Sequence, residues 1–233
     1  MTRRDGEPEP RAPRVLAFDV NETLLDLSVL DPHFESVFGD RAVRVQWFAQ
    51  MLQLAFVGGL TGQYVDFSTA QRAALEMLAR RAGRAVDDDS AALILDTMRR
   101  LPPHPEVAGA LARLGEAGFR RVALTNSPPD VARAQLANAG LGELFEAAHS
   151  ADEVRALKPA RAPYELVAER SGVPVTGVRL IAAHAWDVAG ALAAGCSAAF
   201  VARPGMVLSP LGAQPDIVGR DLEEVASAIL QAA

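Results

Sequence analysis

Five side chains that can do chemistry follow short apolar runs in this sequence, where strands of a sheet would end. They are Asp19 in VLAFD (15–19), Thr125 and Asn126 in RRVALTN (120–126), Lys158 in ALKPA and Asp187 in AWD. The carboxyl ends of parallel strands share one edge of a sheet, so we expect these side chains to meet there. A carboxylate beside an ammonium stays ionised and can act as a nucleophile, which suits covalent catalysis.

Each of these residues alone has an ordinary structural explanation. Asp19 or Asp187 could cap a helix or close a turn. Asn126 begins a Ser-Pro sequence typical of turns, and Lys158 precedes a proline, as solvated loop lysines often do. Their order, one after each successive strand, is harder to explain this way and favours one shared site.

The elements that must position these residues alternate between strand and helix. We expect apolar strands over 15–19, 120–126, 144–150, 178–184 and 197–202, with helical patterns between them. This alternation is typical of a Rossmann-like α/β core, in which helices cover both faces of a parallel sheet. Residues 27–101 break it, because they contain helical patterns and no convincing strand. We therefore expect a core made of 14–26 and 102–233, with 27–101 as a helical cap inserted after the first strand, over the carboxyl ends of the strands.

Composition limits the class of protein. The 233 residues, half of them hydrophobic, suffice for one domain with a sizeable insertion. A net charge of −6 without a basic cluster argues against nucleic-acid binding. The single cysteine, Cys196, excludes an internal disulfide and a thiolate metal cluster. We expect no membrane span, because no apolar stretch reaches about 18 residues. The charged, Pro-rich residues 1–13 predict a disordered tail on a cytoplasmic protein.

Four segments in order, FDVNETLLD, LTN, LKP and AWD, resemble the motifs of the haloacid dehalogenase superfamily. Within it, the type II (S)-2-haloacid dehalogenases are the best match, over roughly residues 14–225. The resemblance implies that Asp19 attacks C2 of a short 2-haloalkanoic acid, expels the halide and forms an aspartyl ester. Water then hydrolyses the ester to a 2-hydroxy acid. The chemistry implied requires neither a cofactor nor a metal.

The resemblance also implies roles for further residues. Thr23 and Lys158 would position Asp19, and Asp187 would orient Lys158 or the hydrolytic water. The backbone N–H groups of loop 20–23 could bind an anionic group of the substrate. The implied substrate- and halide-binding residues are Val20, Asn21, Phe48, Asn126, Tyr164 (which also supports Lys158), His184 and Trp186, with Thr125 at the substrate carboxylate.

Four positions depart from the pattern of those dehalogenases, and one of them is Ala182, which stands where a serine is usual. Asn21 stands where an aromatic residue is usual, Phe48 where a halide-binding arginine is usual, and His184 where an asparagine is usual. Arg41 and Arg44 lie near Phe48 in the sequence but not in register with the missing arginine. We hypothesise that His184 donates a hydrogen bond to the departing halide. The alternative is a core histidine bonded to a backbone carbonyl.

Two other functions stay open. A phosphohydrolase of the same superfamily would need Mg²⁺ held by Asp19 and Asp187, and a proton donor that Asn21 cannot be. A non-catalytic binding protein would fit the changed halide residues, whereas the intact Asp19, Lys158 and Asp187 argue against it. The apolar segment 47–56 either packs inside the cap or forms a homodimer face, as cap surfaces do in related dehalogenases.

Overall fold

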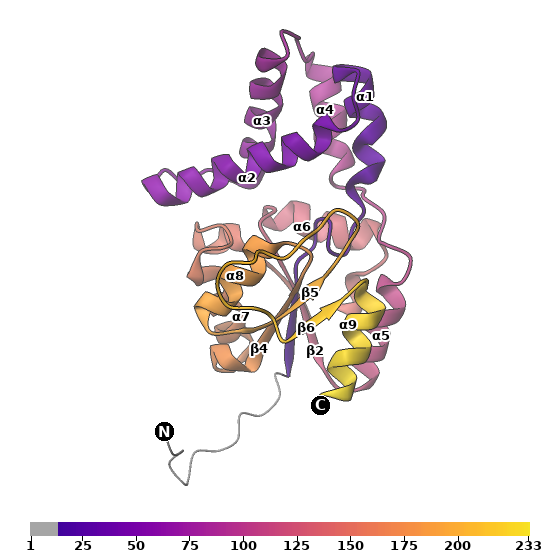
Figure 1. Cartoon of the computed structure of the whole chain (residues 1–233), viewed down its shortest axis with the longest axis vertical. Coiled ribbons are helices and arrows are strands. Elements are labelled where there is room, and N and C mark those ends of the chain that lie inside the picture. Colours follow the sequence, from indigo (N-terminus) through magenta and orange to yellow (C-terminus); the bar gives the residue numbers. More distant parts are fainter. Residues whose placement is uncertain (1–13) are drawn as a thin grey trace.

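A six-stranded parallel sheet forms the centre of the computed structural model, which describes residues 14–233 (Figure 1). The predicted tail over 1–13 lies outside the described residues. The spatial order of the strands is β3-β2-β1-β4-β5-β6. The strands are β1 (Val15–Phe18), β2 (Arg120–Thr125), β3 (Ala147–Ser150), β4 (Val178–Ala182), β5 (Ser197–Val201) and β6 (Ile217–Gly219). The predicted α/β fold class is confirmed, and the short β6 is an additional strand.

Strand β1 lies in the middle of the sheet, where the order of the strands along the chain reverses. Phe18, its last residue, pairs with Ala123 of β2 on one side and Ile181 of β4 on the other. All four residues of β1 are buried, as expected for an unbroken apolar run in a parallel sheet. Asp19 therefore emerges at the switch point, where open α/β sheets bind their ligands.

Helices cover both faces of this sheet. They are α5 (Val107–Glu116), α6 (Pro129–Asn138), α7 (Arg161–Ser171), α8 (Ala185–Ala194) and α9 (Leu222–Gln231), with short 3₁₀ helices at Leu27–Leu30, Gly142–Leu144, Ala151–Val154 and Val175–Gly177 (Figure 1). Leu16 and Phe18 belong to the hydrophobic cluster with α5 and α9, and Val15 and Ala17 to the one with α7 and α8, because successive side chains of a strand point to opposite faces.

Four further helices, which we call the four-helix unit, lie above the sheet in Figure 1. They are α1 (Asp31–Phe38), α2 (Val43–Thr61), α3 (Phe67–Arg81) and α4 (Asp88–Thr97). Trp47, at the start of the apolar segment 47–56, is fully buried, and its Nε1 donates to the Gln71 carbonyl oxygen at 2.9 Å. Inward packing thus accounts for Trp47, and also for Met51 and Ala55, which are buried as well. That residues 27–101 act as a cap stays a prediction.

A close approach of α8 to the segment after Lys158 helps to position the site. A Cβ at Gly190 would lie 2.5 Å from Pro159 Cβ and 2.6 Å from Tyr164 Oη, so only glycine permits this contact without a shift. The contact brings the first turn of α8, which carries Asp187, next to Lys158 and Tyr164.

Among the helices of residues 14–233, none is long and apolar enough to cross a membrane.

Candidate active site

Asp19 is buried at the carboxyl end of β1, and both of its carboxylate oxygens have polar partners. Oδ1 accepts a hydrogen bond from Lys158 Nζ at 2.9 Å. Oδ2 accepts one from Thr23 Oγ1 at 2.5 Å and lies 3.0 Å from His184 Nδ1. Burial alone would raise the pKa of Asp19, but Lys158, His184 and Thr23 together hold it well below its usual value. The site therefore keeps a buried carboxylate ionised at the end of β1.

Lys158 is fully buried, and its ammonium group has three acceptors. Besides Asp19, these are Asp187 Oδ2 at 2.5 Å and the Leu124 carbonyl oxygen at 2.9 Å. Burial alone would lower the pKa of Lys158, but the carboxylates of Asp187 and Asp19 raise it above the usual value. Three acceptors use all three N–H groups of an ammonium. Lys158 is thus a fixed cation that is hydrogen-bonded to Asp19.

Asp187 connects Lys158 to Tyr164. Tyr164 Oη donates to Asp187 Oδ1 at 2.6 Å, so the predicted support of Lys158 by Tyr164 passes through Asp187. Burial raises the pKa of Asp187, and the like charge of Asp19 adds to this against the opposing effect of Lys158. Burial and the neighbouring Asp187 raise the pKa of Tyr164 well above its usual value, so the phenol stays protonated and donates a hydrogen bond to Asp187.

The same contacts argue against a magnesium site. A hard dication takes about six oxygen ligands, but both oxygens of Asp187 already accept hydrogen bonds from Tyr164 and Lys158. The Lys158 ammonium lies between Asp187 and Asp19, in the position that a shared cation would take. Within residues 14–233, no three His, Cys, Asp or Glu side chains are grouped to hold a metal ion. The donor set therefore does not fit the phosphohydrolase alternative.

Thr23 ties the loop after β1 to the rest of the sheet. Its hydroxyl oxygen accepts from the Ala183 N–H at 2.9 Å, just beyond the end of β4. Its carbonyl oxygen accepts from Arg203 Nη2 at 2.9 Å, and Arg203 in turn pairs with Glu106 at 2.6 Å. No motif pointed to Arg203, which lies after β5 and outside the four motif segments.

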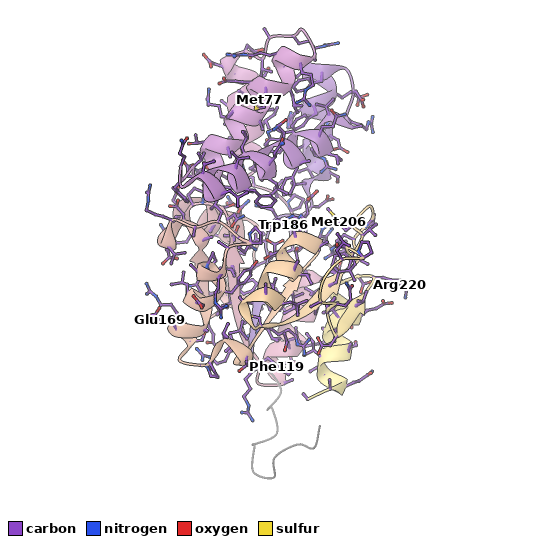
Figure 2. The ribbon with its side chains drawn as sticks, turned by 60° about the vertical axis from the view of Figure 1, so that its left-hand side comes forward. Met77, Phe119, Glu169, Trp186, Met206 and Arg220 are labelled. Carbon is purple, nitrogen blue, oxygen red and sulfur yellow. The ribbon has the colours of Figure 1, made fainter. Side chains whose placement is uncertain are left out.

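Three of the predicted binding residues form a stack of rings beside Asp19. The ring centroids of Phe48 and His184 lie 5.5 Å apart, and those of His184 and Trp186 lie 5.1 Å apart. Trp186 lies at the junction between the four-helix unit and the sheet with its helices (Figure 2). Its Nε1 is buried and has no hydrogen-bond partner in the part of the chain that the structure describes. A buried N–H donor without a partner carries an energetic cost that an anion could remove.

The two predicted asparagines hold backbone and side chains around the site. Asn126 Oδ1 accepts from the Lys158 N–H at 2.8 Å, and its Nδ2 donates to the Lys158 carbonyl oxygen at 3.2 Å. Asn21 Nδ2 donates to Ser127 Oγ at 3.3 Å, and its Oδ1 accepts from Gln135 Nε2 at 2.8 Å. Their predicted contacts with substrate or halide stay predictions.

Thr125 and Val20 are fully buried next to these groups. Thr125 Oγ1 accepts from the Ser127 N–H at 3.1 Å, and the Val20 carbonyl oxygen accepts from the N–H groups of Leu24 and Leu25 at 2.9 and 3.1 Å. A role for either residue in binding the substrate stays a prediction.

His184 contacts two carboxylates. Its Nδ1 lies 3.0 Å from Asp19 Oδ2 and its Nε2 lies 3.0 Å from Glu22 Oε2, so it is not the core histidine bonded to a backbone carbonyl. Burial alone would lower the pKa of His184, but the hydrogen bonds to Asp19 and Glu22 raise it to about 9. His184 is thus an imidazolium near neutral pH. Glu22 was not predicted; its only signal was an acid in loop 20–23.

One cavity, of about 570 Å³, adjoins this site without enclosing Asp19. It is lined by the end of α2, including Phe56, and by Leu157 and Pro159 on either side of Lys158. Phe56 meets Trp186 edge-on, with the ring centroids 5.6 Å apart. The cavity therefore lies next to the ring stack and beside the segment that carries Lys158.

The sheet order and the Asp19–Lys158–Asp187 group define a Rossmann-like α/β enzyme with an ionised carboxylate at the carboxyl end of its central strand. The family model of the haloacid dehalogenase-like hydrolases matches residues 13–195, and the chain belongs to that family. The resemblance inferred from the four motif segments is thereby confirmed.

Known relatives match nearly the whole chain. Haloacetate dehalogenase H-2 of Moraxella sp. (strain B) is 33% identical over 203 residues, which cover 86% of this chain and 91% of that protein. The L-2-haloacid dehalogenase structure from Xanthobacter autotrophicus matches with a TM-score of 0.87 and 29% identity, over 94% of this chain and 99% of that one. The structure of that enzyme with chloropropionic acid covalently bound, with the same coverage, has a TM-score of 0.86 and 28% identity.

A charged His184 should make the free energy of unfolding depend on pH. Folding raises the pKa of His184 from 6.5 to about 9, so its contribution is complete below pH 6.5 and is lost as the pH rises through about 9. The difference corresponds to about 3 kcal/mol. Urea unfolding should therefore show that the stability lost in His184→Gln is largest near pH 6 and shrinks toward pH 9. The other histidines are common to both proteins and cancel. A loss that is the same at every pH would contradict a charged His184.

Proposed function

We propose that this hydrolase is a dehalogenase of short 2-haloalkanoic acids, in which Asp19 displaces the halide from C2. The observation that carries the proposal is the buried, ionised carboxylate of Asp19, held by Lys158 in a set of groups that does not fit Mg²⁺. Displacement of a halide from carbon needs neither a metal nor an acid, because the halide leaves as a stable anion. The names of the relatives, and the covalent adduct in one of their structures, support the same reaction.

The reaction takes place in two steps. In the first, an oxygen of Asp19 attacks C2 from the side opposite the halogen, the carbon–halogen bond breaks, and the halide leaves with the electron pair. This inverts C2 and leaves an ester between Asp19 and the substrate. In the second, water attacks Cγ of Asp19 and releases the 2-hydroxy acid. One halide and one proton are released for each water consumed, and the carboxylate of Asp19 is restored.

We assign the halide site to the indole N–H of Trp186. This buried donor has no partner among the described residues, and its ring stacks on His184 next to Asp19. His184 is a weaker candidate for the same role, because each of its ring nitrogens already faces a carboxylate. The Thr125 hydroxyl and the backbone N–H groups of loop 20–23, which begins at Val20, remain the proposed site for the carboxylate of the substrate.

We also propose that the four-helix unit is the cap of this site. Helix α2 supports this, because it supplies Phe48 to the ring stack and Arg44 to an ion pair with Glu22 at 3.3 Å. A homodimer and a cytoplasmic location stay predictions from the sequence.

Halide release tests the proposed reaction. The substrates are (S)- and (R)-2-chloropropionate with chloro-, bromo- and fluoroacetate, in the presence of EDTA. We expect release from the (S) enantiomer alone of the pair, and a loss of roughly 10³-fold or more in Asp19→Asn, which lacks the nucleophile. Silence across the panel, together with Mg²⁺-dependent hydrolysis of a phosphate ester, would overturn the proposal.

Trp186→Phe tests the halide site, because it removes the N–H and keeps an aromatic ring for the stack. A hydrogen bond to a charged group contributes about 1.5–3 kcal/mol, so we expect kcat/KM for chloroacetate to fall by roughly 10- to 100-fold. Inhibition by free chloride and bromide should weaken in parallel. Unchanged inhibition constants would remove Trp186 from the halide site.

A further inference from the structure

His184 is held in one orientation by contacts on every side of its ring. Phe48 stacks on it with an angle of 12° between the ring planes, and Trp186 stacks at 27°. Its two nitrogens lie 3.0 Å from carboxylate oxygens of Asp19 and Glu22. Only 5% of the residue is exposed. The ring therefore keeps Nδ1 directed at the nucleophile and Nε2 directed at a second acid.

Glu22 is itself fixed in place. Its φ of 61° lies in the left-handed region, which costs a residue other than glycine energy and persists only where the surroundings enforce it. Its carbonyl oxygen lies 3.2 Å from His104 Nε2, and its Oε1 accepts from Arg44 Nη1 at 3.3 Å. Arg44 Nε also donates to Asp31 Oδ1 at 2.5 Å. A chain of alternating charges thus runs from the four-helix unit through Glu22 to His184.

We propose that His184, oriented by Glu22, is the general base that activates water for hydrolysis of the ester on Asp19. The inference rests on the proposed dehalogenase function and concerns its second step. His184 is then a catalytic residue that contacts the reacting water, and Glu22 is a positioning residue that holds Nε2–H.

Formation of the ester itself converts His184 from a hydrogen-bond donor into a base. In the resting enzyme, the charges and hydrogen bonds of Asp19 and Glu22 raise the pKa of His184 to about 9 against the effect of burial. Esterification removes the charge on Asp19, so less opposes the effect of burial, and the pKa of His184 falls. The charged groups around His184 are Asp19 and Glu22 in direct contact, Lys158 and Asp187 beyond Asp19, and Arg44 beyond Glu22.

The proton balance closes over one turnover. After the halide leaves, His184 releases the proton on Nδ1 to solvent. Nδ1 then takes a proton from water while the water oxygen bonds to Cγ of Asp19. The tetrahedral intermediate then collapses, and the bond breaks between Cγ and the bridging ester oxygen that is attached to C2. This oxygen takes the proton from His184 and becomes the hydroxyl group of the product. Asp19, now a carboxylic acid, returns its proton to His184, which restores the resting charges.

The other groups around Asp19 are poorer bases. Lys158 donates all three of its N–H groups and has no lone pair to offer. Both oxygens of Asp187 accept hydrogen bonds, from Lys158 and Tyr164. Of these groups, His184 is the one that presents to Asp19, through Nδ1, a nitrogen that has a free lone pair once it has lost its proton.

Rapid-mixing measurements of halide release and of the mass of the intact protein test this role. His184→Gln keeps an amide donor but has no basic nitrogen. We expect it to release a burst of one halide per active site, followed by turnover at least about 10²-fold slower than in the wild type. The ester should accumulate and be found on the peptide containing Asp19. Glu22→Gln should slow the second step by about 10-fold, because it leaves the base in place but weakens its orientation.

The pH dependence and a matched control separate a base from a structural residue. In the wild type, the rate of ester hydrolysis should rise with pH as His184 loses its proton. In His184→Gln, this rise of the rate with pH should be absent. His149→Gln replaces a half-buried histidine on β3, outside the site, and should behave as the wild type does.

Two outcomes would overturn the inference. One is turnover by His184→Gln at the wild-type rate without accumulation of the ester. The other is a slow first release of halide with no burst, which would assign His184 to the first step. Failure of the proposed function looks different, because the wild type itself would then release no halide.

Discussion

A buried ammonium between two buried carboxylates is the interaction on which the site depends. Lys158 Nζ lies 2.9 Å from Asp19 Oδ1 and 2.5 Å from Asp187 Oδ2, and the three side chains are at most 6% exposed. Removal of one partner from such a group leaves an unpaired buried charge, at a cost of about 3–5 kcal/mol. The sheet makes the group possible, because β1, β2 and β4 are neighbours: Asp19 follows β1, the Leu124 carbonyl of β2 holds Lys158, and α8 after β4 carries Asp187.

Phe48 and His184, two of the residues that depart from the family pattern, are in contact with each other beside Asp19. In the dehalogenases that the sequence resembles, an arginine is usual at the position of Phe48 and an asparagine at that of His184. Here the two side chains stack with their centroids 5.5 Å apart. By that comparison, one cation is absent from α2 and another is present on the core side, where Glu22 holds it. The positive charge now belongs to a group that can lose its proton, whereas an arginine cannot.

The sequence was most informative where short apolar runs end in polar residues. The strands that carry Asp19, Thr125 and the segment before Asp187 could be predicted this way, and their order implied the shared site. Strand β6 was missed because it has three residues and exposes Val218. The contact between Glu22 and His184 joins residues 162 positions apart and depends on a left-handed loop residue, which no periodicity signals. The engaged amides of Asn21 and Asn126 depend on side-chain directions that strand order does not determine.

The fate of the oxygen from water tests the central claim, which is that water attacks Asp19 rather than the substrate carbon. The enzyme, in excess over (S)-2-chloropropionate, would complete a single turnover in heavy-oxygen water. Mass spectrometry would then follow the peptide containing Asp19 and the 2-hydroxy acid. The account predicts the heavy oxygen in the carboxylate of Asp19 and an unlabelled hydroxyl group in the product. Heavy oxygen in the product hydroxyl with none in Asp19 would show direct attack of water on C2 and contradict the account.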